Sequence, residues 1–295
     1  MKSLKKIFIN IIALMMLLVA TFSFSACAKE EIITLKVKIG AYDTANSAMY
    51  VEDLSLTVNL YRHLAPQTVD KIVEYVKETD NNFYKDAIFY TDDNAKTILV
   101  GDLKFEDSQV VQAVKPEIYG EFKSNGTVGS NLKNKKGSIG LWRSTFDSDT
   151  SLSTSSDARD SGRATWYMPT ESISSYDGFT CIFAQIDLDD SATNTAFNAI
   201  DAILSDSKYY DNYVIYYTGE YDENDKDGNH GLEFHCVAKS SWTDGYNVAK
   251  KQFNGQDVFF AEGQQLKSYN FRNVKLPKLN DFGQSYAYIK SIEII

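Results

Sequence analysis

The chain has 295 residues and a formal charge of −10, from 30 Lys and Arg against 40 Asp and Glu. This length fits one large domain or two ordinary ones of about 150 residues each. Hydrophobic residues make up 43% of the chain, which is enough for a sizeable core and excludes global disorder. The acidic balance argues against nucleic acid as a partner, because a phosphate backbone requires a basic surface.

The first residues have the features of an export signal. Three lysines precede an apolar run over residues 7–20 that is too short to be a comfortable membrane span. Residues 24–27, Phe-Ser-Ala-Cys, resemble the lipobox of bacterial lipoproteins, in which cleavage leaves an acylated cysteine at the new N-terminus. Lipidation of Cys27 would anchor the protein to the cell membrane, outside the cytoplasm. The alternative is an ordinary signal peptide that is cut near Ala26.

These features predict three segments: a lipoprotein signal peptide over 1–26, a tether over 27–32 and a folded domain over 33–295. In the domain, residues 33–39 and 54–60 alternate between apolar and polar side chains, which is typical of half-buried strands. Residues 41–52 between them are expected to form a loop.

A helix follows, because apolar residues recur at helical spacing from Val69 to Val76 and Pro66 stands near its start. A second short helix is expected over 197–204. Further strands are expected at 87–90, 98–100, 137–142, 164–168, 180–186 and 287–295. Residues 145–163 are rich in Ser and Asp, which predicts a loop. Tyrosines are concentrated over 209–221, which is typical either of the outward-facing positions of antiparallel strands or of a binding surface.

Other candidate sites have weaker patterns. Residues 222–228 resemble a calcium loop, but Phe234 stands where the bidentate glutamate should be, so we expect no metal site and no cofactor. His230 and His235 flank this turn without a third ligand nearby. Cys181 and Cys236 could form one disulfide or remain two core thiols, and we favour the thiols because nothing else indicates a disulfide framework.

Several segments, in order, resemble the cyclophilin family of peptidyl-prolyl cis–trans isomerases. The N-terminal half carries LYRHLAPQTV (60–69), FYKDAIFY (83–90) and Gly101-Asp102. Further along, the resemblance is carried by residues 137–144, 164–168 and 176–184, and by the last strand at 289–294.

The resemblance implies a mainly β fold: a closed eight-stranded antiparallel β-barrel capped by two helices, with residues 205–285 as a large insertion before the last strand. It also implies a proline-containing peptide or an exported protein as the partner. In this family an arginine guanidinium assists rotation about the X–Pro bond, and the proline ring binds in an apolar pocket. The peptide groove then maps onto Phe89, Leu99, Trp142, Thr165, Tyr167, Tyr176 and Thr180.

The resemblance fails at the residues that carry the chemistry. Thr91 replaces the family arginine, Leu99 and Thr165 replace glutamines, and Thr180 replaces the pocket histidine. Trp142 replaces a small alanine and would partly fill the groove. Arg143, or Arg163, could reach in as a substitute donor, although both are more simply explained as solvated rim residues.

Two functions therefore remain open. The first is an isomerase of weak activity that acts on exported polypeptides. The second is a catalytically inactive module that binds a peptide or a partner protein at the cell surface. The family resemblance favours the first function, and the residues at positions 91, 99 and 180 favour the second.

Overall fold

The computed structural model describes residues 32–43, 48–49, 54–78, 82–92, 96–106, 109–127, 132–143, 162–207, 209–218, 222, 224–225, 231, 233–240, 271–278 and 286–295. The chain divides into two compact units, Met1–Ile32 and Ile33–Ile295. Ile32 ends the first unit, and every other described residue belongs to the second. The signal peptide, Cys27 and most of the 145–163 loop lie outside the described residues.

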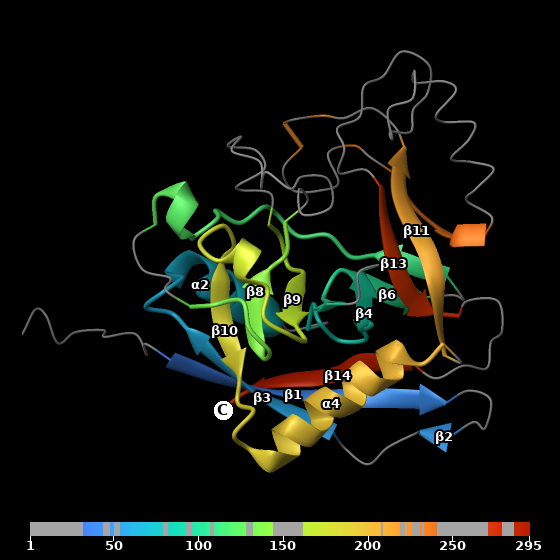
Figure 1. Cartoon of the computed structure of the whole chain (residues 1–295). Coiled ribbons are helices and arrows are strands. Elements are labelled where there is room, and N and C mark those ends of the chain that lie inside the picture. Colours follow the sequence, from blue (N-terminus) through green and yellow to red (C-terminus); the bar gives the residue numbers. More distant parts are fainter. Residues whose placement is uncertain are drawn as a thin grey trace, which may run out of the picture. The chain divides into compact units, whose positions relative to one another are not determined.

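The described elements are mostly strands (Figure 1). They are β1 (Ile32–Asp43), β2 (Ala48–Met49), β3 (Leu54–Tyr61), α2 (Pro66–Val76), β4 (Tyr90–Asp92), β5 (Thr97–Val100), β6 (Leu103–Glu106), β7 (Gln109–Gln112), the 3₁₀ turn η1 (Lys123–Asn125), β8 (Ser138–Leu141), β9 (Trp166–Pro169), the 3₁₀ turn η2 (Ser174–Tyr176), β10 (Ile182–Ile186), α4 (Ser191–Ser205), β11 (Tyr210–Thr218), β12 (Glu233–Ala238), β13 (Phe271–Pro277) and β14 (Tyr286–Ile294).

The expected mainly β fold with antiparallel pairing and two α-helices is confirmed for the described residues. The strands at 33–39 and 54–60 and the helix from Pro66 are present, and the second helix is longer than expected because it begins at Ser191. The expected loop at 41–52 is partly wrong, since β1 continues to Asp43 and pairs there with β2.

The expected closed eight-stranded barrel is wrong. The main sheet follows an open path, β12-β11-β13-β4-β5-β9-β8-β10-β3-β1-β14, with β2 paired beside β1. The reason lies in the 205–285 region, because its strands β11, β12 and β13 extend the sheet from the edge of β4. β14 meets the segment before β4 only through the isolated bridge between Ile88 and Tyr288 and neighbouring backbone hydrogen bonds.

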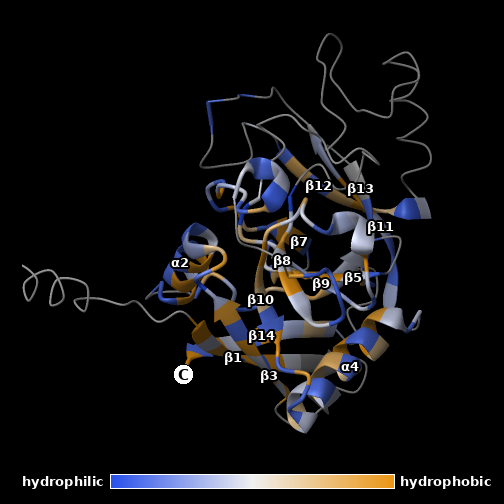
Figure 2. Cartoon of the chain, turned by 60° about the vertical axis from the view of Figure 1, so that its left-hand side comes forward, coloured by the Kyte–Doolittle hydropathy of each residue, from blue (hydrophilic) through white to orange (hydrophobic). Residues whose placement is uncertain are grey.

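Both helices pack on this sheet, and Figure 2 shows that each carries hydrophobic and hydrophilic residues. The start of α4 is capped by the Asp190 carboxylate, which accepts a hydrogen bond from the Thr193 amide at 2.8 Å. The start of α2 has no cap from its own N-cap residue. Instead the buried Glu121 carboxylate accepts hydrogen bonds from the amides of Gln67 and Thr68 at 3.1 and 2.7 Å.

The buried side chains form two clusters. The first, here called the main core, contains 37 buried residues and includes Phe89, Ile98, Trp166 and Phe183. The second, here called the second core, is a smaller contiguous cluster. It consists of Ile88, Tyr90, Leu99, Leu103, Val110, Trp142, Tyr167, Ile182, Tyr213, Ile215, Val274 and Leu276.

Candidate functional site

Of the expected groove residues, Leu99 on β5 and Tyr167 on β9 lie within strands. The others are Phe89, Trp142, Thr165 and Thr180, which stand within two residues of the ends of β4, β8, β9 and β10, and Tyr176, which is in η2. One row of paired residues crosses β4, β5, β9 and β8, in which Tyr90 pairs with Leu99, Leu99 with Tyr167, and Tyr167 with Gly140. Residues directly opposite one another in an antiparallel pair point to the same face of the sheet. We call this side the groove face, defined by Tyr90, Leu99, Trp142 and Tyr167, all of which belong to the second core.

The groove face is buried. Leu99 and Tyr167 are each 0% exposed, and Trp142 is 7% exposed. The Trp142 and Tyr167 rings pack edge to face with centroids 6.2 Å apart. A Cβ atom at Gly140 would stand 2.2 Å from the Tyr167 ring, so this ring lies directly over the glycine backbone.

Residues of the 205–285 region complete this cluster. Tyr213 and Ile215 from β11 and Val274 and Leu276 from β13 are buried in the second core together with the groove face. β13 also pairs with β4 through Val274 opposite Asp92 and Lys275 opposite Thr91. The surface on which the family resemblance places a peptide is therefore packed as protein interior.

Two expected site residues do not join the groove face. Phe89 belongs to the main core. Thr91 pairs with Ile98, a residue of the main core, so alternation along the strand directs Thr91 away from Tyr90 and Leu99. Thr91 is 5% exposed, and its hydroxyl donates a hydrogen bond to the Asp92 carbonyl at 3.1 Å.

A polar network occupies the position between Tyr167 and Thr180. Both hydroxyls donate to the Asn134 side-chain oxygen Oδ1, at 2.5 Å from Tyr167 and 3.2 Å from Thr180. The backbone and side-chain nitrogens of Asn134 in turn donate to Asp177 at 2.8 and 3.1 Å. Asn134 is itself buried, so its amide fills the space beside the Tyr167 hydroxyl.

The electrostatics of this network keep its groups in their ordinary charge states at neutral pH. Burial raises the pKa of Tyr167 well above its usual value, so its hydroxyl stays neutral and acts as a donor. Hydrogen bonds from Asn134 and Lys133 outweigh partial burial and lower the pKa of the Asp177 carboxyl, which is therefore a charged acceptor. Asn134 therefore links a neutral donor, Tyr167, to a charged acceptor, Asp177, which is also paired with Lys133 at 3.1 Å.

The remaining expected residues border the same region. The Thr165 side chain is buried, and its carbonyl accepts a hydrogen bond from the Trp142 amide at 2.8 Å. Tyr176 is partly buried against the second core, and its carbonyl is a second acceptor for the Thr180 hydroxyl at 3.2 Å.

The two candidate substitute donors are engaged elsewhere. Arg143 is buried, and its guanidinium lies over the Phe122 ring at 5.2 Å from the centroid. Arg163 is 3.8 Å from the Glu117 carboxylate. Arg143 follows β8, and β8 is three strands away from β4, the strand of Thr91, in the sheet order. At the usual spacing between strands, this separation is about 14 Å.

Two residues of the site were missed by the sequence reasoning. Tyr90 lies on the groove face and its hydroxyl donates to Asp102 at 2.9 Å, and strand alternation next to position 91 could have indicated it. Asn134 stands in a polar stretch without periodicity, so no signal in the sequence pointed to it.

The other sequence expectations are answered only in part. Cys181 and Cys236 are both described and are not joined by a disulfide. No helix within the described ranges has the length and apolar character needed to cross a membrane. The described residues bring together no group of three potential metal ligands, and Glu223, residues 226–228 and His230 of the calcium-like loop lie outside them.

Of the comparisons with known proteins, the one with solved structures finds a similarity. No protein-family model matches the chain, and no curated protein matches it. Among solved structures, the chain is similar to a cyclophilin type peptidyl-prolyl cis-trans isomerase from Cryptosporidium parvum, with 12% sequence identity and a TM-score of 0.36. That match covers 69% of this chain and 98% of the other. At this identity and TM-score the similarity assigns the chain to no family.

Proposed function

We propose that the protein is a cyclophilin-like module that has lost isomerase chemistry and binds a peptide or an exported protein at the cell surface. The observation that carries the proposal is the burial of the groove face, whose residues belong to the second core together with side chains of β11 and β13. Leu99, Tyr167 and Trp142 share one core with Ile215 and Val274. A proline ring that entered here would have to displace packed side chains.

The chemistry of isomerisation explains why this burial matters. Rotation about a peptide bond has a barrier of about 18–20 kcal/mol, which a catalyst lowers by holding the proline and directing a fixed donor at the twisted amide. Thr91 carries a short neutral hydroxyl that donates to a backbone carbonyl. Loss of a preorganised donor alone typically costs about 10²–10³ in rate, and burial of the pocket adds to this loss.

The N-terminal sequence supports the proposed location at the cell surface. Processing before Cys27 and acylation of its thiol would hold the domain on the outer surface of the cell membrane without a spanning helix. Exported polypeptides would then be its neighbours. Removal of residues 1–26 would take away three lysines and leave a net charge of −13, which opposes close contact with an anionic leaflet and favours soluble partners over the membrane itself.

A proline isomerisation assay tests the proposal against the rival function, a weak isomerase. The full-length protein, purified in detergent, is added to a proline-containing tetrapeptide, and the cis–trans relaxation rate is compared with the thermal rate. We expect no acceleration. We also expect none from Thr91→Arg, because position 91 shares a face with Ile98 and not with Leu99. Acceleration by the wild-type protein would overturn the proposal, and acceleration by the variant alone would show that an open groove lacks only its donor.

A further inference from the structure

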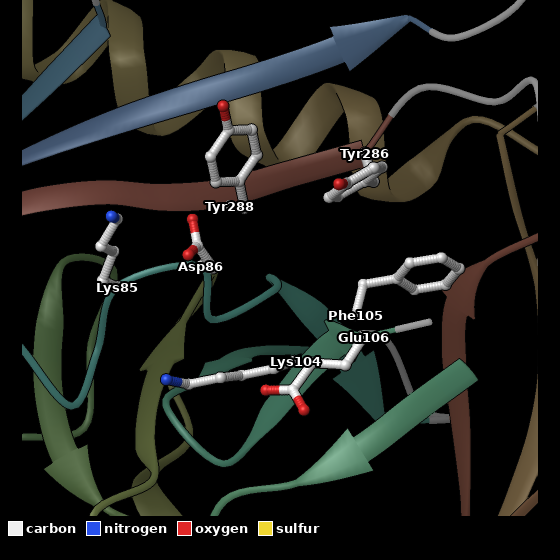
Figure 3. Close-up of a pocket in the computed structure, with 7 residues that line it drawn as sticks. All are labelled: Lys85, Asp86, Lys104, Phe105, Glu106, Tyr286 and Tyr288. Atoms are coloured by element: carbon white, nitrogen blue, oxygen red, sulfur yellow. The ribbon is translucent and has the colours of Figure 1, made fainter. Parts of the chain in front are cut away.

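A cleft of about 470 Å³ lies between β14 and β6 (Figure 3). Its volume is within the range of small-molecule sites, about 300–1,000 Å³. Seven residues line it: Lys85, Asp86, Lys104, Phe105, Glu106, Tyr286 and Tyr288. They comprise three aromatic rings, two basic groups and two acidic groups.

The rings form a preorganised apolar wall. Tyr286 and Tyr288 stand two residues apart on β14, with centroids 5.6 Å apart, and Phe105 of β6 is 6.0 Å from Tyr286. The Tyr288 ring lies against the backbone of Gly40, where a Cβ atom would meet it at 2.3 Å. Contact with β1 therefore fixes this ring before any ligand arrives.

The four charged groups of the cleft make no ion pair and no side-chain hydrogen bond with any residue that the structure describes. Lys104 is the most enclosed of them: its ammonium lies 5.7 Å from the Phe83 centroid, and burial lowers its pKa. Asp86 is held in the left-handed region at φ 64°, with its amide bonded to the Ile289 carbonyl at 2.8 Å. The backbone thus places its carboxylate, which interacts electrostatically with Lys104.

We propose that this cleft binds a small zwitterion with an aromatic or apolar body, namely a free amino acid or a short peptide with free ends. Its ammonium would meet Asp86 and Glu106, its carboxylate would meet Lys85 and Lys104, and its body would lie against the three rings. A ligand with a charge of only one sign would meet two cleft groups of its own sign, because cations and anions are equally represented there. None of these residues defines the groove face, although the three rings pack against the second core. Binding to the cleft is measured separately from isomerisation, so this proposal can fail without the proposal for the groove face.

Isothermal titration calorimetry on the full-length protein tests the proposal with four probes that share one ring. L-Phenylalanine carries both charges, phenylethylamine only the cation, 3-phenylpropionate only the anion, and N-acetylphenylalanine amide neither. We expect saturable binding of phenylalanine and at least about tenfold weaker binding of each of the other three. The tripeptide Ala-Phe-Ala, with free ends, is the fifth probe. If it binds more tightly than phenylalanine, the natural ligand is a short peptide, and if phenylalanine binds more tightly, the natural ligand is a free amino acid.

Variants assign the binding to the cleft. Lys104→Met keeps the apolar stem over Phe83 but removes the charge, and Glu106→Gln removes one acceptor charge. Each should weaken the zwitterion about tenfold or more, while Lys96→Met, in an exposed ion pair with Glu171 that does not line the cleft, should leave binding unchanged. Absence of binding by both zwitterions, equal affinity for all probes, or affinity unaffected by both cleft variants would overturn the proposal.

Discussion

Replacement of Leu99 by alanine measures whether the groove face is protein interior. Leu99 is 0% exposed and packs in the second core between Tyr90 on β4 and Tyr167 on β9. Truncation of a leucine in such a position costs about 2–5 kcal/mol, from lost transfer energy and the cavity left behind. On a solvated groove the same change would cost about 0.5 kcal/mol or less.

The free energy of unfolding is measured by urea titration of wild type, Leu99→Ala and two controls. Leu56→Ala removes a side chain of the main core that is also fully buried, and Ile294→Ala removes one that is 39% exposed. We expect Leu99→Ala to match the Leu56 variant, with a melting temperature about 5–15 °C below wild type. If Leu99→Ala instead behaves like the Ile294 variant, the second core does not exist as described.

The remaining predictions concern single contacts. Glu121→Gln should destabilise the protein by about 1–2 kcal/mol, because a neutral amide replaces the charged acceptor for two amides of α2; urea unfolding measures this. Gly140→Ala should cost about 1–3 kcal/mol in the same titration, because its Cβ would stand 2.2 Å from the Tyr167 ring. Burial raises the pKa of Cys181 to about 12, so the folded thiol stays protonated at pH 9 while the unfolded thiol titrates, and stability falls as the pH rises above about 9. At pH 9, peptide-mapped alkylation of Cys181 should be at least about 100-fold slower in native than in denatured protein. Cys27→Ser should move the protein from the membrane fraction to the soluble or secreted fraction and abolish palmitate labelling.

Local periodicity was sufficient to predict most of the elements. The alternation over 54–60 and the helical spacing after Pro66 each reflect one buried face, and both elements occur where expected, as β3 and α2. The β6–β7 hairpin was missed, because the alternation of Leu103–Glu106 is only four residues long and the returning strand, Gln109–Gln112, does not alternate.

The state of the candidate site depended on contacts that periodicity does not encode. The apolar character of Leu99 and Val274 predicts burial for each residue, but not that they share a core, since they are 175 residues apart in sequence. The same holds for Glu121, whose role as the cap of α2 depends on a segment 53 residues away. The open sheet likewise depends on the pairing of β13 with β4, which a local pattern cannot specify.

Solvent accessibility of the groove face in solution tests most directly whether this face is protein interior. A soluble paramagnetic gadolinium chelate is added to methyl-labelled protein, and the relaxation enhancement of the Leu99 methyl groups is compared with that of Leu56 and Ile294. If the face is buried in the second core, the Leu99 methyls should be as protected as those of Leu56. Enhancement similar to that of the exposed Ile294 methyls would contradict this burial and restore an open groove.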